Sequence, residues 1–386
     1  MKRSWLIMLM IPLFLFSCAQ NAASDSETTE AVAKETEPET ESEVVTEPPD
    51  DRPIEIREVD ALLQRLTDFR YVLSEEPVSF SGRWFEKEID GVPHHVTVNA
   101  GSELYFAVYG TDQILVNFTE ITVLKTPYFA VSVDGNEPVR QLITEPSVGL
   151  PDEGAHVLRI VADGLTESEN KYNGEIGFAF RDVDPCGGVL VGIRPTGRTI
   201  MFFGDSITEG VRALNMNADS DGNSASHSYP WYCAKALGAV PINVGFAASG
   251  TVGAGSFAPC LTAIDWLSAT RPVEDLPEPD VIVLAHGHND VFFKEADVAP
   301  RYRAVLDRLA EKYPDSRLFV LIPFSQTHAD TIRACCEGRD FVTIIETADW
   351  NPSTTDGVHL NAVGTSSAGN KLAKALRREL GDAFFD

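Results

Sequence analysis

Cysteine and basic residues are both scarce in this sequence. Its 386 residues include 6 Cys, of which Cys335 and Cys336 are adjacent. So few cysteines at this spacing exclude a disulfide scaffold and a zinc ribbon. Lys and Arg number 31 against 58 Asp and Glu, which gives a formal charge of −27. A field of that sign repels polyanions, so we expect no nucleic-acid partner.

Long hydrophobic runs are lacking as well. The apolar stretch near the amino terminus, Trp5 to Phe16, has 12 residues and is too short to span a bilayer. It follows two basic residues, Lys2 and Arg3, and it precedes a small residue. This layout predicts a secretory signal peptide over residues 1–17.

A cysteine directly after that small residue makes the segment resemble a bacterial lipobox. The resemblance implies that Cys18 is the lipidated first residue of the mature protein, which is then lipid-anchored on the extracellular face of a bacterial membrane. The alternative is a plain signal peptide in which the cysteine occurs by chance. Residues 18–53 follow, with 11 acidic side chains, 2 basic ones and no aromatic residue. This composition offers too little apolar surface to offset the entropy of ordering, so we expect a disordered acidic tether.

The rest of the chain has a globular composition. Hydrophobic residues make up 44% of the sequence and charged residues 23%, and the length predicts two or three domains. Residues 54–190 contain short β-rich runs with turn signals such as Asp134-Gly135 between them. This pattern predicts a β-sandwich of jelly-roll type. The predicted strands cover residues 96–98, 104–109, 114–118, 128–133, 157–161 and 176–180.

Residues 196–386 have a different sequence pattern, in which apolar runs alternate with helical stretches. Continuous Val, Ile and Leu runs are typical of strands buried on both faces. We therefore predict a three-layer α/β domain with a parallel sheet. Ligands of such domains bind beyond the carboxyl ends of the strands, so polar residues at those ends are the candidates for a site. The predicted strands cover residues 199–203, 241–244, 281–285 and 318–322.

A serine follows the first of these strands, in Gly204-Asp205-Ser206. A tight turn before a helix would expose the hydroxyl to a space that the backbone N–H groups of the helix start also face. The alternative is that Ser206 is a helix N-cap and Glu209 completes a capping box. A Gly-x-Ser-x-Gly elbow is absent, which excludes the α/β-hydrolase template.

Three further polar residues occur at later strand ends. Asn289 follows the third predicted strand, and Asp356 and His359 precede a helical stretch over 361–380. Asp and His three residues apart can lie on one side of a turn, so that the carboxylate holds the imidazole with its other nitrogen toward Ser206. The alternatives are a turn carboxylate and an interior histidine.

Four blocks of the sequence together resemble the SGNH, or GDSL-type, hydrolase superfamily over residues 199–380. They are Gly204-Asp205-Ser206, the glycine-rich block from Gly245 to Gly250, Gly287-His288-Asn289-Asp290 and Asp356-x-x-His359. The resemblance implies a serine esterase in which Ser206 is the nucleophile, His359 the general base and Asp356 the residue that orients the base. It implies no metal and no cofactor. Leu360 stands where the family usually has Pro.

The same resemblance implies an oxyanion hole. Its donors would be the Ser206 N–H, the Asn289 side-chain amide and one glycine N–H. We favour Gly250 for this glycine, with Gly245 second, because the segment from Gly245 to Gly250 is slightly longer than the usual spacing of the family.

A β-sandwich before the hydrolase domain is similar to carbohydrate esterase family two, the bacterial polysaccharide deacetylases. This similarity implies that acetyl groups are removed from a plant-type polysaccharide or oligosaccharide, such as acetylxylan or a glucomannan, through an acyl-enzyme. Members of that family can lack the acid of the triad, so the resemblance implies that Asp356 matters less to the reaction than Ser206 or His359. We expect a monomer.

Other functions stay open at this stage. One is a general short-chain acyl esterase or lipase on the same triad, and another is a carbohydrate-binding lipoprotein with a vestigial site. A third is a metallohydrolase, because His286-x-His288-x-Asp290 resembles the start of a metal-binding motif, with Val291 in place of its last His. Four aromatic residues are candidates for a sugar or acyl subsite, although ordinary core packing is the favoured interpretation of each: Trp231, Phe292, Phe293 and Trp350.

Overall fold

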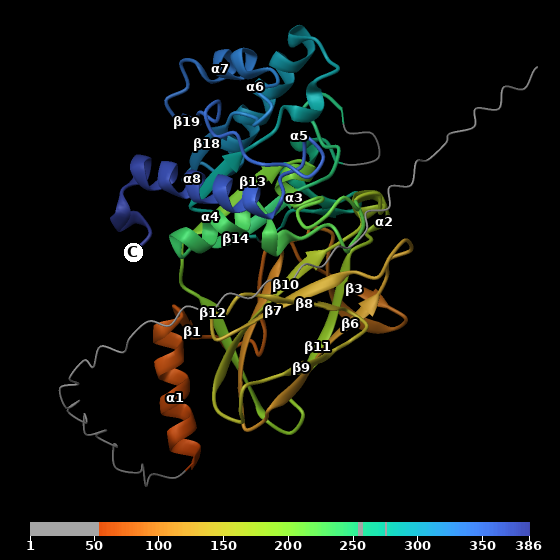
Figure 1. Cartoon of the computed structure of the whole chain (residues 1–386), viewed down its shortest axis with the longest axis vertical. Helices are drawn as coiled ribbons and strands as arrows, with labels where there is room; N and C mark the ends of the chain where they lie inside the picture. The colour runs from red at the N-terminus through yellow and green to blue at the C-terminus, as the bar shows by residue number, and fades with distance from the viewer. Residues whose placement is uncertain (1–53, 254–257, 275) are drawn as a thin grey trace, which may run out of the picture. The chain divides into compact units, whose positions relative to one another are not determined.

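The computed structural model describes residues 54–253, 258–274 and 276–386 (Figure 1). The predicted signal peptide, Cys18 and the predicted tether lie outside the described residues. Within the described part of the chain, no helix is both long and apolar enough to cross a membrane. The described cysteines are all free thiols: Cys186, Cys233, Cys260, Cys335 and Cys336.

The first part of the described chain is a sandwich of two antiparallel sheets. The seven-stranded sheet has the order β1-β12-β5-β10-β7-β8, with β2 beside β5, and the five-stranded sheet has the order β3-β4-β11-β6-β9. The strands are β1 (Tyr71–Leu73), β2 (Ser79–Ser81), β3 (Phe85–Ile89), β4 (Val92–Thr97), β5 (Glu103–Tyr109), β6 (Gln113–Glu120), β7 (Tyr128–Val133), β8 (Val139–Leu142), β9 (Ser147–Gly149), β10 (His156–Gly164), β11 (Phe178–Asp184) and β12 (Val189–Pro195).

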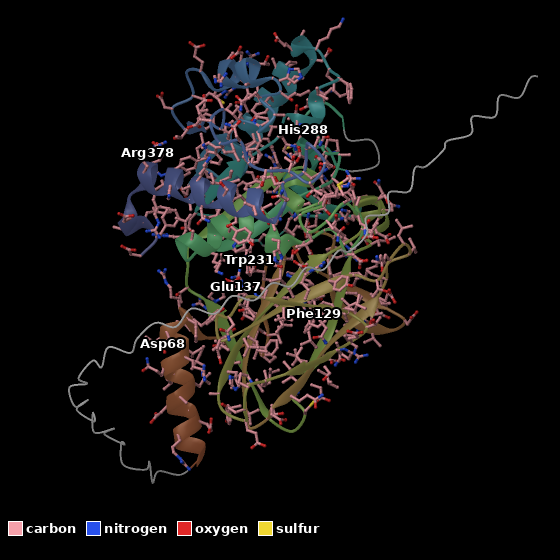
Figure 2. The ribbon with its side chains drawn as sticks, viewed as in Figure 1. Asp68, Phe129, Glu137, Trp231, His288 and Arg378 are labelled. Atoms are coloured by element: carbon pink, nitrogen blue, oxygen red, sulfur yellow. The ribbon has the colours of Figure 1, made fainter. Side chains whose placement is uncertain are left out.

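Strand β5 shows how the sandwich is packed. Its even-numbered side chains, such as Phe106, join Phe178 and Phe129, which is labelled in Figure 2, in the core between the sheets. Its odd-numbered side chains, such as Tyr105, pack against Leu62 on the outer face. Because side chains alternate between faces of a sheet, β5 is buried on both. The covering element is the helix α1 (Ile54–Asp68), which we did not predict.

The six predicted strands correspond to β4, β5, β6, β7, β10 and β11. The strands that the pattern missed are short or carry charged residues, as in β3 with its Glu-Lys-Glu core, so their apolar signal is weak. Strand β12 runs to Pro195, past the predicted boundary at residue 190, and pairs with β5.

The second part is the predicted three-layer α/β domain. Its parallel sheet has the order β14-β13-β17-β18-β19, and β19 is the strand that the sequence did not reveal. Helices α5, α6 and α7 cover one face, and α4 and α8 cover the other (Figure 1). The elements are β13 (Thr199–Gly204), α4 (Tyr229–Leu237), β14 (Val240–Gly245), α5 (Cys260–Asp265), β17 (Val281–Leu284), α6 (Glu295–Lys312), β18 (Arg317–Leu321), α7 (Ala329–Cys336), β19 (Val342–Ile345) and α8 (Ala362–Leu380).

Smaller elements complete the fold. The short helices α2 (Lys171–Gly174) and α3 (Ser206–Glu209) follow β10 and β13, and β15 (Trp266–Ser268) pairs with β16 (Arg271–Pro272). Single 3₁₀ turns cover Ala225–His227, His288–Asp290 and Asp382–Phe384.

The register of the parallel sheet places the candidate residues. Gly204 at the end of β13 pairs with Gly245 at the end of β14, and Phe203 pairs with Leu284 at the end of β17. The chain therefore leaves these three strands at the same edge, and β13 lies between the other two. The loop that carries Ser206 is flanked by the glycine-rich loop on one side and by the Asn289 loop on the other.

Candidate active site

Ser206 is the first residue of helix α3. The Asp205 carboxylate accepts a hydrogen bond of 2.9 Å from the Ile207 N–H, so Asp205 is the N-cap. The Glu209 carboxylate does not reach back to the cap; it contacts Lys171 and accepts from the Ala247 N–H at 2.9 Å. The capping-box interpretation of Ser206 is therefore wrong, and its hydroxyl is available for other contacts.

The Ser206 hydroxyl contacts His359, which in turn contacts Asp356. The distance from Ser206 Oγ to His359 Nε2 is 2.9 Å, and that from His359 Nδ1 to Asp356 Oδ2 is 2.8 Å. Ser206 and His359 are buried, at 5% and 8% exposure. An ionised carboxylate can only accept, so Nδ1 carries the imidazole proton and Nε2 accepts from the serine hydroxyl. The three residues lie in the order of a nucleophile, a base and an orienting acid.

Asp356 is held as a carboxylate by its surroundings. Its Oδ1 accepts from the backbone N–H of Val358 at 3.0 Å and of His359 at 2.8 Å, in a turn that places Gly357 at a φ of +91°. Its Oδ2 also accepts from Arg212. Burial by itself would raise the pKa of Asp356, but the hydrogen bonds from His359, Val358 and Arg212 hold that pKa well below its usual range.

Arg212 was not found by sequence reasoning. It lies 144 residues before Asp356, in a loop without any motif, so no local signal pointed to it.

Asn289 lies beside the glycine-rich loop. Its Nδ2 donates to the Ser249 carbonyl at 3.0 Å. A side-chain amide has two N–H donors, so this contact orients the group and leaves the second donor for a ligand. The next residue, Gly250, approaches Asp290 so closely that an added Cβ would lie 2.5 Å from its Oδ1.

The two candidate glycines differ in their backbone N–H groups. The Gly245 N–H donates to Asn243 Oδ1 at 2.9 Å and is therefore engaged. Among the described residues, the N–H groups of Gly250 and Ser206 have no acceptor. The structure thus favours Gly250 over Gly245 as the glycine with an available donor.

Asp290 joins the two flanking loops. Its carboxylate accepts from Thr251 N and Val252 N, each at 3.0 Å, and from Thr251 Oγ1 at 2.7 Å. The residue therefore fixes the glycine-rich loop against the end of β17. Within the described ranges, no group of three or more His, Cys, Asp or Glu side chains is arranged to hold a metal ion.

The two histidines before Asn289 have separate surroundings. Burial lowers the pKa of His286 to about 4, so it is a neutral interior side chain at neutral pH. His288 Nδ1 lies 3.0 Å from Ser325 Oγ, and burial lowers its pKa, with the nearby His359 adding to the effect.

A cleft of about 330 Å³ adjoins the triad. Its walls include Ile207, Val358 and Leu360, the immediate sequence neighbours of Ser206 and His359. Most of its other lining residues are small or polar, as suits a hydroxylated ligand. The lining residues are Ile207, His288, Phe324, Ser325, Asn351, Pro352, Thr354, Gly357, Val358 and Leu360.

The four candidate aromatic residues separate into two groups. Trp231 is buried on α4 (Figure 2), where the Arg159 guanidinium lies 4.0 Å from its ring centroid, and Trp350 packs on Phe324. Both are packing residues. Phe292 is 93% exposed and Phe293 is 39% exposed, so these two rings, which follow Asp290 after one intervening residue, face solvent.

A comparison with protein-family sequence models matches residues 202–366 to the GDSL-like Lipase/Acylhydrolase family. The matched segment begins in β13 and ends in α8, and so it contains Ser206, Asn289, Asp356 and His359. The resemblance to the SGNH or GDSL-type hydrolases is confirmed for this part of the chain. A search of curated protein sequences finds no match.

Solved structures resemble the chain across both domains. An acetyl xylan esterase from the rumen bacterium Butyrivibrio proteoclasticus has a TM-score of 0.65 at 16% identity, covering 81% of this chain and 98% of its own. A family two carbohydrate esterase from Clostridium thermocellum, in complex with cellohexaose, has a TM-score of 0.63 at 19% identity, covering 79% of this chain and 99% of its own. A family two carbohydrate esterase from Cellvibrio japonicus has a TM-score of 0.61 at 17% identity, covering 81% and 98%. The likeness shows a common fold, in which a sandwich precedes a parallel-sheet domain.

Proposed function

We propose that this protein is a serine esterase that removes O-acetyl groups from a plant-type polysaccharide through an acyl-enzyme. The observation that carries the proposal is the chain of contacts from Ser206 Oγ to His359 Nε2 and from His359 Nδ1 to Asp356. That chain is what a hydroxyl needs in order to act as a nucleophile near neutral pH.

The first half of the reaction forms the acyl-enzyme. Ser206 Oγ attacks the ester carbonyl carbon while its proton passes to His359 Nε2. The carbonyl oxygen becomes an oxyanion, which accepts hydrogen bonds from the Ser206 and Gly250 N–H groups and from the Asn289 amide. Each such donor is worth on the order of 2.7–4 kcal/mol to the transition state. The imidazolium then gives its proton to the sugar oxygen as the C–O bond to the acyl group breaks.

The second half regenerates the enzyme. Water loses a proton to His359 Nε2 and attacks the acyl carbon, and the same donors hold the second oxyanion. Acetate leaves as Ser206 Oγ takes the proton back from the imidazolium. Asp356 stays ionised throughout, because its hydrogen bonds hold its pKa well below the usual range.

The substrate class is proposed from the surface around the triad. The polar cleft lined by sequence neighbours of Ser206 and His359 suits the hydroxyl groups of a sugar, and the exposed ring of Phe292, three residues after Asn289, offers an apolar face. The fold is that of carbohydrate esterases, one of which was solved in complex with cellohexaose. Acetylxylan and acetylated glucomannan are the polymers we would test first.

Replacement of Ser206 by Ala tests the proposal. We expect acetate release from acetylated xylan and hydrolysis of 4-nitrophenyl acetate to fall by about 10⁴-fold or more. Ser147→Ala, an exposed serine of β9 in the sandwich, is the matched control and should keep full activity. Unchanged turnover in Ser206→Ala would refute the serine mechanism.

A series of acyl chains separates the proposal from a general acyl esterase or lipase. A deacetylase should lose activity steeply from 4-nitrophenyl acetate to the butyrate and octanoate esters. If Ser206→Ala and the native protein are equally inactive on every ester while both bind xylan, the protein is a carbohydrate-binding lipoprotein with a vestigial site.

We further propose that Cys18 anchors the protein on the outer face of a bacterial membrane. The support is the sequence around Cys18, which resembles a lipobox. In cells, Cys18→Ser should move the protein from the membrane fraction to a soluble fraction. Retention of that variant in the membrane would contradict the anchor.

A further inference from the structure

The contact between Arg212 and Asp356 begins a path that leads from the proposed triad to the β-sandwich. The Asp356 Oδ2 atom accepts from both Arg212 Nη1 and His359 Nδ1. Arg212 therefore restrains the carboxylate at the oxygen that orients the imidazole. The side chain of Arg212 is 29% exposed and that of Asp356 is 13% exposed, so the pair is partly shielded from water.

The backbone of Arg212 is fixed from two sides. Its N–H donates to Asn223 Oδ1 at 2.9 Å, and its carbonyl accepts from Thr355 Oγ1 at 2.7 Å. Its φ is +54°, a left-handed conformation that a non-glycine residue keeps only where its surroundings enforce it. These contacts hold the start of the Arg212 side chain beside the turn that carries Asp356.

Asn223 is in turn held by the sandwich. It is 2% exposed, and its Nδ2 donates at 2.8 Å to the carbonyl of Leu165, directly after β10. Its own carbonyl accepts from Arg140 Nη2 at 2.9 Å. Arg140 belongs to β8, so two separate segments of the sandwich form hydrogen bonds with Asn223.

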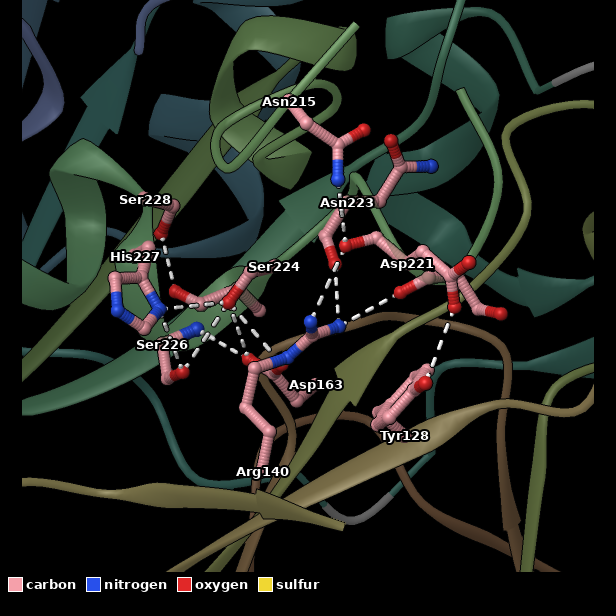
Figure 3. A network of polar contacts seen from close by, with 12 residues as sticks. Tyr128, Arg140, Asp163, Asn215, Asp221, Asn223, Ser224, Ser226, His227 and Ser228 are labelled. Atoms are coloured by element: carbon pink, nitrogen blue, oxygen red, sulfur yellow. Dashed lines mark hydrogen bonds and ion pairs between the residues drawn. The ribbon is translucent and has the colours of Figure 1, made fainter. Parts of the chain in front are cut away.

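Arg140 is itself fixed in place, as Figure 3 shows. Its Nε contacts Asp163 Oδ2 at 2.5 Å, and its Nη2 donates to the Ser220 carbonyl at 2.7 Å. Its guanidinium carbon lies 4.4 Å from the centroid of the Tyr128 ring. The Asp163 side chain is fully buried, so this end of the path is rigid.

We propose that Arg212 is a positioning residue for the triad, and that the β-sandwich sets its place through Asn223 and Arg140. This inference rests on the proposed function. The sandwich is then part of the scaffold of the active site and has a role in turnover as well as any role in binding polysaccharide. Arg212 touches Asp356, and its effect on the reaction passes through His359.

The consequence is a loss in kcat with little change in KM. Without Arg212, the Asp356 carboxylate keeps its backbone donors but can rotate, so the imidazole is less often aligned with Ser206. We expect Arg212→Met to lower kcat on 4-nitrophenyl acetate by about 10-fold and to leave KM within about twofold. Arg212→Lys, which restores a cation, should recover part of the loss.

Arg333→Met is the matched control. Arg333 of α7 is 35% exposed and pairs with Asp330 of the same helix and with Glu346, directly after β19. Its removal should leave kcat and KM unchanged. An Arg212→Met variant with kcat within twofold of the native value would overturn the positioning role.

A double-mutant cycle tests the link to the sandwich. Asn223→Ala alone should lower kcat by about fivefold, and the same change in an Arg212→Met background should lower it by less than twofold, because both act on one path. Arg140→Lys serves as a milder second variant if Asn223→Ala fails to fold, which near-ultraviolet circular dichroism will show. If the kcat losses of Arg212→Met and Asn223→Ala multiply in the double variant, the proposal that the sandwich positions Arg212 is wrong.

Ser206→Ala is measured in the same series. If it retains native turnover, the proposed function has failed. If it is inactive while Arg212→Met and Asn223→Ala turn over normally, the function stands and this inference alone is wrong.

Discussion

A buried ion pair links the sandwich to the helix of the proposed nucleophile, and its removal can be predicted in detail. Lys171 of α2 contacts Glu209, the last residue of α3, and the two side chains are 1% and 2% exposed. Glu209 also accepts from the Ala247 N–H at 2.9 Å, in the glycine-rich loop. Burial raises the pKa of Glu209 above its ordinary value, and Lys171 opposes that rise.

Lys171→Met leaves the Glu209 carboxylate buried beside an apolar side chain. Breaking a buried pair from one side costs about 3–5 kcal/mol of unfolding free energy. The Glu209 pKa then rises further above its unfolded value of about 4.3. A carboxyl group whose pKa is higher in the folded than in the unfolded protein destabilises the fold as pH rises above the unfolded-state pKa. The deficit in unfolding free energy of Lys171→Met should therefore be larger at pH 8 than at pH 5.

Urea unfolding followed by tryptophan fluorescence, at both pH values, measures this deficit. The double variant Lys171→Met/Glu209→Gln removes both charges and should recover most of it. Lys235→Met is the matched control, because Lys235 of α4 also pairs with a sandwich residue, Glu137, but at 44% and 76% exposure. It should cost at most about 1 kcal/mol. A Lys171→Met variant within 1 kcal/mol of the native protein at pH 8 would refute the reasoning.

Three further predictions concern the site. Asn289→Ala should lower kcat on 4-nitrophenyl acetate by about 10²–10³-fold with the urea midpoint nearly unchanged; a loss below threefold would remove Asn289 from the oxyanion hole. Burial raises the pKa of Asp205 to about 7, so this carboxyl destabilises the fold as pH rises from about 4 to 7. Asp205→Asn, which keeps an acceptor for the Ile207 N–H, should therefore raise the unfolding free energy by up to roughly 4 kcal/mol at pH 8 and hardly at all at pH 4. An equal gain at the two pH values would contradict the raised pKa of Asp205. Phe292→Ala should raise KM for acetylated xylo-oligosaccharides by about two- to tenfold while kcat on 4-nitrophenyl acetate stays within twofold, and an unchanged KM would rule out a stacking role.

Ser206, Asn289 and the glycine-rich block could be placed from the sequence because each follows a recognisable strand. The runs 199–203, 241–244 and 281–285 are apolar enough to identify buried parallel strands, and residues after such strands meet at one edge of the sheet. This rule alone predicts that Ser206, the glycine-rich block and Asn289 lie at that edge. Asp356 and His359 were linked by their spacing of three residues.

Other features were missed. The helix α1 has a local signal that we did not use, because four apolar residues recur at helical spacing: Val59, Leu62, Leu63 and Leu66. The strand β19 is a mostly apolar run of only four residues, which is too short to identify by pattern alone. The capping-box interpretation of Ser206 failed because distant residues decide the contacts of Glu209. Glu209 has the right spacing for a cap, but Lys171 and Ala247 engage its carboxylate.

The sequence by itself determined the long apolar strands of both domains and the polar residues that follow them, because these depend on neighbours along the chain. Only the tertiary structure decided that the Gly245 N–H is engaged while that of Gly250 has no acceptor among the described residues, and that Arg212 and Asn223 connect Asp356 to the sandwich. A hydrogen bond acts over about 3 Å. The partner of such a bond therefore depends on which distant segments fold into contact, and this cannot be predicted from spacing along the chain.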